Sequence, residues 1–116
     1  MEFRTPLHIK PSRFKIGYDT PGLVCGSCFA ERIGQKMLAC KMPVTLNPYG
    51  LLFNPASIAG MLDNLKVSRS FSKRDLIRHN GRWISLQHHG SFSADEAENL
   101  LQAIETATQQ GHESLE

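Results

Sequence analysis

The chain has 116 residues, 41% of them hydrophobic and one of them Trp, which is enough to bury one core but not two. Its formal net charge of +2 is close to balance and its basic residues are scattered, so we expect no nucleic-acid partner. No apolar run approaches the roughly 20 residues that a membrane span needs, and the first residues do not form a signal-peptide core, so the expected location is cytoplasmic.

Residues 1–22 are expected to lead into the domain. Residues 3–9 alternate loosely between apolar and polar side chains and could form a short strand, although Pro6 would confine that strand to a sheet edge or a bend. Residues 11–22 are rich in turn-forming residues, which predicts a loop.

A strand, a sharp turn and a helix are predicted next. Leu23 and Val24 indicate the end of a buried strand, and Gly26 permits a turn that a residue with a Cβ would resist. Apolar side chains then recur at helical spacing, which predicts a helix from about residue 28 to residue 42, ended by the following Pro. Its buried face is expected to carry Phe29, Ile33 and Met37.

Ser27 lies at the junction between this strand and this helix. At or near a helix N-terminus, free backbone N–H groups and the positive end of the helix dipole would stabilise an oxyanion. Ser27 is therefore placed as a nucleophile would be. The alternative is that Ser27 only caps the helix, with Glu31 in the first turn.

A second helix is predicted after an ordered loop. Residues 44–46 could be a short strand, and residues 47–55 contain two Asn-Pro pairs and a Gly, which argues against regular structure there. Asn54 is a favourable N-cap, and Pro55 suits the first helical position. The apolar stripe of this helix consists of Ile58, Met61, Leu62 and Leu65.

The following stretch is more polar. Residues 66–78 are basic and are interpreted as a solvated face, with Ser72 as the cap of a short helix through Ile77. The Asn80-Gly81 pair predicts a turn, and residues 83–86 predict a strand that the segment around His88 and His89 closes.

The last element is predicted to be a helix. Residues 93–96 read as a capping box, and Gly111 reads as the stop signal. The apolar positions between them are Ala97, Leu100, Leu101, Ile104 and Ala107.

The pentapeptide Gly26-Ser27-Cys28-Phe29-Ala30 resembles the signature of the GSCFA family, a group of bacterial proteins that resemble the SGNH or GDSL-type serine hydrolases. Residues 47–50, 53–58 and 83–89 are similar to later family blocks in the expected order, so the resemblance runs from about residue 23 to about residue 93. It implies an α/β fold of the three-layer α/β/α type, with a mostly parallel sheet.

The resemblance also implies a function. Ser27 would be the nucleophile of an ester hydrolase or acyltransferase that forms an acyl-serine, with no cofactor and no metal. The substrate would be an acylated small molecule, lipid or carbohydrate. By analogy with the Gly and Asn donors of those hydrolases, the Gly50 backbone N–H or Asn54 could point at the oxyanion. Capping remains the alternative role of Asn54.

A serine hydrolase also needs a base, which SGNH relatives take from a His late in the domain. No such block is found here, so the sequence is expected to be the front part of a larger domain, with residues 23–114 as the family-like segment and residues 115–116 as a possible tag scar. Such a piece would have little hydrolase activity and could self-associate. His88 and His89 remain alternative candidates for the base, or structural residues.

Cys25 and Cys28 form a C-x-x-C pair, which leaves a non-enzymatic binding or thiol redox module as the alternative function. His88 or His89 could join a zinc site, but adjacent residues in a strand point to opposite faces, so at most one could. Three cysteines without an export signal fit reduced thiols. Cys25 and Cys40 are expected to be small buried residues, while Cys28 could itself act as the nucleophile.

Overall fold

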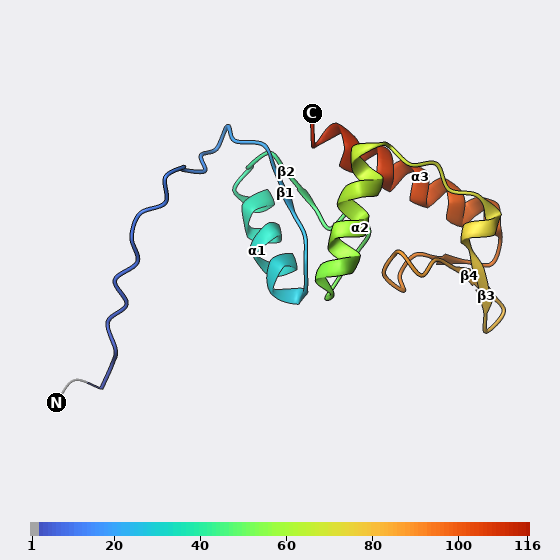
Figure 1. The fold of residues 1–116 in the computed structure, drawn as a ribbon, viewed down its shortest axis with the longest axis horizontal. Helices are drawn as coiled ribbons and strands as arrows, with labels where there is room; N and C mark the ends of the chain where they lie inside the picture. Colours follow the sequence, from blue (N-terminus) through green and yellow to red (C-terminus); the bar gives the residue numbers. More distant parts are fainter. Residues whose placement is uncertain (1–2) are drawn as a thin grey trace.

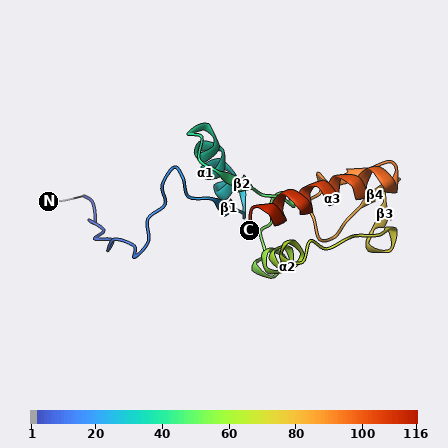
Figure 2. The same cartoon turned by 90° about the horizontal axis from the view of Figure 1, so that it is seen from above.

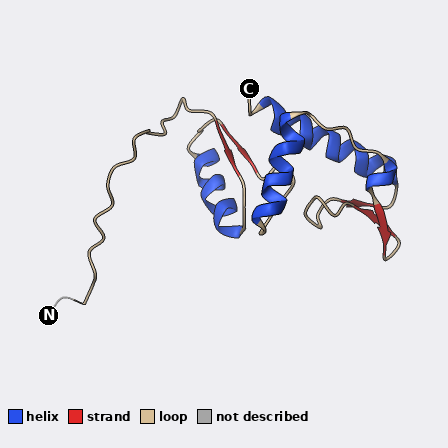
Figure 3. Cartoon of the chain, in the orientation of Figure 1, coloured by secondary structure: helices blue, strands red, loops and turns tan. Residues whose placement is uncertain are grey.

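The computed structural model describes residues 3–116, in which three α-helices, a small parallel sheet and a small antiparallel sheet form a mixed α/β fold (Figures 1 and 3). No helix in this range is long and apolar enough to cross a membrane. In chain order the elements are β1 (Gly22–Val24), α1 (Cys28–Ala39), β2 (Val44–Leu46), α2 (Pro55–Lys66), the 3-10 turn η1 (Lys73–Asp75), β3 (Ile77–His79), β4 (Arg82–Ile84), β5 (Ser93–Ala94) and α3 (Ala97–Glu113).

Residues 3–21 form an extended arm that leads away from the rest of the chain (Figure 1). The strand predicted over residues 3–9 is wrong, because the arm has no neighbouring strand to pair with and Pro6 has no N–H to donate. The loop predicted over residues 11–22 is confirmed as far as Pro21, since Gly22 already belongs to β1.

The parallel sheet explains where the predicted site lies. β1 and β2 pair with Leu23 opposite Thr45, and α1 connects them. α1 and α2 lie on opposite sides of this strand pair (Figures 1 and 2). Because parallel strands end at the same edge, the turn at residues 25–27 and the loop at residues 47–54 leave the sheet side by side. Ser27 therefore lies next to the second loop.

α1 turns a different face to the sheet than its apolar spacing predicts. Gly34 is its buried residue and packs directly against the Leu46 side chain, so the absence of a Cβ lets the helix approach β2. Phe29 and Ile33 were expected to be buried, but they are 74% and 41% exposed. A helix that packs through glycine leaves its larger apolar side chains at the margin of the contact.

α1 is also shorter than predicted. It ends at Ala39 rather than near residue 42, because Lys41 adopts a left-handed backbone with φ of 61°. α1 therefore ends before Met42, the residue whose backbone Pro43 restricts. The strand predicted over residues 44–46 is confirmed as β2.

The core consists of two adjoining clusters that α2 and α3 contribute to, and Phe71 packs against both. The apolar stripe predicted on α2 is confirmed, with Met61 and Leu65 fully buried. The two clusters contain Tyr49, Leu52, Met61 and Leu65, and Leu76, Ala97, Leu100 and Ile104.

The antiparallel sheet has the order β3-β4-β5. The turn predicted at Asn80-Gly81 is confirmed, since both residues have positive φ and connect β3 to β4. The short helix predicted from Ser72 through Ile77 shrinks to η1, because Ile77 instead pairs with Ile84 across the hairpin.

Both predicted ends of the last helix differ in the structure. The capping box at residues 93–96 is absent, because Ser93 and Ala94 form β5 and pair with β4, and Glu96 becomes the N-cap without a side-chain hydrogen bond. Gly111 does not stop α3, which continues to Glu113. A Cβ added at Gly111 would lie 2.6 Å from Leu65 Cδ2, so this glycine permits the close approach of α3 to α2.

Gly111→Ala is therefore expected to destabilise the fold by about 1–3 kcal/mol through overpacking against Leu65. This sign is opposite to that of helix propensity, which favours Ala over Gly by about 1 kcal/mol. Gly60→Ala is the matched control, because nothing lies within 4 Å of a Cβ at Gly60 on α2. Urea unfolding of both variants measures the difference, and equal stabilisation by both would contradict the close packing.

Candidate functional site

Ser27 is the N-cap residue of α1, at the turn that follows β1. The turn is as sharp as predicted, because Gly26 has φ of 143°, a conformation that side chains with a Cβ rarely adopt. Ser27 occupies the capping position, but its side chain makes no capping hydrogen bond. The hydroxyl is therefore left for other chemistry, beside the first N–H groups and the positive end of the α1 dipole.

The loop after β2 is held against this turn by hydrogen bonds to both sides of Gly26. The Gly26 N–H donates to Asn47 Oδ1 at 3.0 Å, and the Leu52 N–H donates to the Gly26 carbonyl at 3.1 Å. Asn47 Nδ2 in turn donates to the Glu31 carboxylate on α1. Sequence reasoning placed Asn47 only within an ordered loop, although an Asn directly after a strand is a signal for main-chain bonding.

The two oxyanion donors proposed from the sequence lie in this loop. The Gly50 N–H donates to the Asn47 carbonyl at 2.8 Å and closes a turn, so it is already in use. Asn54 caps α2 as predicted, since its Oδ1 accepts from the Ala56 N–H at 2.8 Å. The cap uses only the oxygen of the Asn54 amide, so capping and donation from Nδ2 are compatible.

His88 lies in an aromatic enclosure rather than at the Ser27 turn. It is 7% exposed, and its ring centroid is 3.9 Å from that of Tyr49, 5.3 Å from that of Phe71 and 5.0 Å from that of Phe92. Its Nδ1 hydrogen bonds with Ser85 Oγ at 2.7 Å. Burial lowers the pKa of His88 from 6.5 to about 4, so the ring is neutral at pH 7.

His89 contacts the loop after β2, where its backbone N–H donates to the Tyr49 carbonyl at 2.9 Å. Its Nδ1 accepts from the Ser91 N–H at 3.2 Å. Its Cβ packs against Gly50. The two histidines lie in the loop that follows β4, so the alternation of strand residues that was expected to separate them does not apply. Across residues 3–116, no hydrogen bond joins Ser27 to an imidazole.

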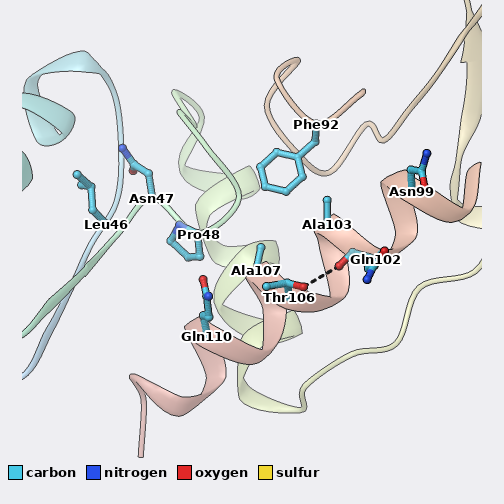
Figure 4. Close-up of a pocket in the computed structure, with 10 residues that line it drawn as sticks. All are labelled: Leu46, Asn47, Pro48, Phe92, Asn99, Gln102, Ala103, Thr106, Ala107 and Gln110. Carbon is cyan, nitrogen blue, oxygen red and sulfur yellow. Dashed lines mark hydrogen bonds between the residues drawn. The ribbon is translucent and has the colours of Figure 1, made fainter. Parts of the chain in front are cut away.

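Two open cavities adjoin the loop after β2. A groove of about 650 Å³ lies between this loop and α3, and Phe92 and Pro48 border it (Figure 4). None of its lining residues is charged. A second cavity, of about 480 Å³, is lined by both the Asn47 network and His89. Its lining consists of Glu31, Leu38, Leu46, Asn47, Gly50, Leu51, His89 and Ser91.

The cysteines do not belong to a metal-binding cluster among residues 3–116. Burial raises the pKa of the half-buried Cys25, whereas a reactive thiolate needs a lowered pKa. All three thiols are free, and no group of three His, Cys, Asp or Glu side chains among residues 3–116 is placed to hold a metal ion. Cys40 was expected to be buried but is exposed, because it caps the C-terminal end of α1.

A family model described as the GSCFA family matches residues 22–116, which includes the Ser27 turn, the loop after β2 and both adjacent histidines. No curated protein and no solved structure matches the chain.

Proposed function

This chain belongs to the GSCFA family, and on that premise we propose that Ser27 is the nucleophile of an ester hydrolase or acyltransferase resembling the SGNH or GDSL type. Ser27 Oγ attacks the carbonyl carbon of an ester, and the alcohol leaves as the acyl-serine forms. Water, or a second alcohol, then releases the acyl group from Ser27.

The proposal rests on the Ser27 hydroxyl, which is not used for capping. It lies at the N-terminus of a helix of 12 residues and makes no capping hydrogen bond. The N–H groups of the first helical turn would stabilise the negative charge that develops on the attacked carbonyl oxygen. Asn54 Nδ2 is the side-chain donor that we propose for the same oxyanion.

The uncharged groove beside α3 supports an uncharged substrate. Phe92 and Pro48 offer apolar surface for an acyl chain or a sugar ring, and the amides of Gln102 and Gln110 offer partners for hydroxyl groups. An acylated small molecule, lipid or carbohydrate fits this lining better than a charged ester does.

We also propose that β1 and β2 belong to a larger, mostly parallel sheet in a three-layer α/β/α domain. Among residues 3–116, each strand of the pair has one unpaired edge, and the exposed Phe29 and Ile33 leave apolar surface on α1. Parallel sheets are normally covered on both faces and extended by further strands. A structure of the full-length protein in which both edges stay unpaired would contradict this arrangement.

Labelling with a fluorophosphonate tests the nucleophile. We expect slow but selective modification of Ser27 after long incubation at about pH 8, mapped by peptide mass spectrometry, because the helix N-terminus stabilises the oxyanion-like adduct. Ser27→Ala should abolish the label. Ser57→Ala is the matched control, since Ser57 is exposed on α2 and lies outside the turn. Modification at Cys28 instead, or no modification, counts against Ser27.

A further inference from the structure

Asn47 is the residue through which the two loops at the carboxyl edge of the parallel sheet hold each other. Its backbone N–H donates to the Val24 carbonyl at 2.8 Å, and its carbonyl accepts from the Gly50 N–H at 2.8 Å. Its side chain accepts from Gly26 and donates to Glu31. The backbone N–H and carbonyl of Asn47 and both polar atoms of its side chain are therefore hydrogen bonded. The residue is only 9% exposed.

These bonds fall on both sides of Ser27. Gly26 directly precedes Ser27, and Glu31 lies one helical turn after it, where its N–H donates to the Ser27 carbonyl at 3.0 Å. Fixing the Gly26 N–H sets the orientation of the Cys25–Gly26 peptide, one residue before Ser27. Fixing the Glu31 side chain ties the first turn of α1 to the same Asn47 amide. Together these bonds restrain the backbone on both sides of Ser27.

The residue type at this position follows from the geometry. Asn47 has φ of 41°, and Asn is among the few residues with a Cβ that tolerate a left-handed backbone. Its amide offers an acceptor for the Gly26 N–H and a donor for the Glu31 carboxylate at the same time. Asp lacks the donor and Gly lacks both groups.

We propose that Asn47 is a positioning residue for the Ser27 nucleophile, acting through a bridge from the Gly26 N–H to the Glu31 carboxylate. This inference rests on the proposed function, because positioning matters only if Ser27 reacts. Asn47 does not touch the reacting atoms. It holds the turn that presents them, and small displacements of a reacting group are known to cost large factors in rate.

The test reverses the polarity of the bridge. Asn47→Asp keeps the acceptor for Gly26 but places a carboxylate against Glu31, and we expect the rate of fluorophosphonate labelling at Ser27 to fall about tenfold to a hundredfold. Adding Glu31→Gln to Asn47→Asp supplies a donor from residue 31 to the new carboxylate. The double variant should recover labelling to within about threefold of the unsubstituted chain, which loss of packing alone would not allow.

Gln35→Ala is the matched control, because Gln35 donates to the other oxygen of Glu31 on the exposed side of α1 and should leave labelling unchanged. If Asn47→Asp fails to fold, as judged by circular dichroism, Glu31→Ala removes the bridge from the half-exposed helix surface and should slow labelling as well. Hydrogen exchange at the Gly26 N–H gives a second readout. We expect protection in the unsubstituted and double variants and faster exchange in Asn47→Asp, where repulsion from Glu31 displaces the carboxylate that accepts from Gly26.

The outcomes separate the two proposals. No labelling at Ser27 in the unsubstituted chain contradicts the proposed function, and exchange at Gly26 then still reports whether the bridge exists. If folded Asn47→Asp and Glu31→Ala are labelled at Ser27 as fast as the unsubstituted chain, the positioning role is overturned and the proposed function stands. A double variant that is labelled as slowly as Asn47→Asp also overturns the positioning role. In that case the slow labelling would not come from loss of the bridge between residues 47 and 31.

Discussion

Ester hydrolysis by this chain is expected to be slow, with a Ser27-dependent rate for p-nitrophenyl acetate about 10²–10⁴-fold below that of a serine activated by a base in contact. A serine hydroxyl is a weak nucleophile until a neighbouring group accepts its proton. Within residues 3–116 no imidazole is hydrogen bonded to Ser27. The helix N-terminus can stabilise the oxyanion, but it cannot take the proton.

The measurement is the difference in hydrolysis rate between the unsubstituted chain and Ser27→Ala at the same concentration. Adding free imidazole to both samples should increase this difference, because a soluble base then replaces the missing contact. His89→Ala should leave the difference unchanged, since the His89 ring is hydrogen bonded to Ser91 and, within residues 3–116, not to Ser27. Fast hydrolysis that is lost in both Ser27→Ala and His89→Ala would make His89 the base.

The parts of the fold that the sequence predicted well depend on local signals. Asn54 and Pro55 mark the start of α2 by capping chemistry that needs no partner elsewhere, and Asn80-Gly81 forms the turn that its backbone preferences require. The turn at Gly26 was predictable for the same reason. Local chemistry therefore located Ser27 and the main helices.

The parts that sequence reasoning missed depend on close approaches between distant segments. Gly111 was interpreted as a stop signal and Gly34 was given no role, whereas each lies where a helix touches a leucine from another element. The same holds for the site. Asn47 is 21 residues away from the Gly26 N–H that it binds, and no spacing rule connects the two. A glycine or asparagine gives the same sequence signal whether it serves its own turn or a remote contact.

His88 shows this limit for titratable residues. In the sequence it was a candidate base or zinc partner, because its segment resembles a family block, and a structural role was the alternative. In the structure three aromatic rings enclose it, and its Nε2 is buried with no hydrogen-bond partner among the described residues. Burial favours the neutral form of the His88 ring, so its protonation should lower the stability of the fold rather than contribute to catalysis.

The chain is expected to lose about 2–3 kcal/mol of its free energy of unfolding between pH 7 and pH 4.5 because of His88. The pKa of His88 is lowered from 6.5 to about 4 in the folded state. Above pH 6.5 the ring is neutral in both states, and the full stability is present. Below pH 6.5 the unfolded chain binds a proton that the folded chain does not take up until about pH 4, so stability falls as the pH falls.

Urea unfolding at intervals across this range, followed by circular dichroism, measures the loss. His88→Gln should be less stable than the unsubstituted chain at pH 7, since it removes ring packing against Tyr49, and should show a smaller decline toward pH 4.5. His79→Gln is the matched control, because His79 is exposed on the β3-β4 hairpin and its substitution should leave the decline intact.

Asp75, whose pKa is lowered from 3.8 chiefly by hydrogen bonds from Ser72, contributes its loss of stability only below this pH range. A decline that is the same in His88→Gln as in the unsubstituted chain would show that His88 does not set the acid sensitivity, and that its enclosure tolerates the charged ring.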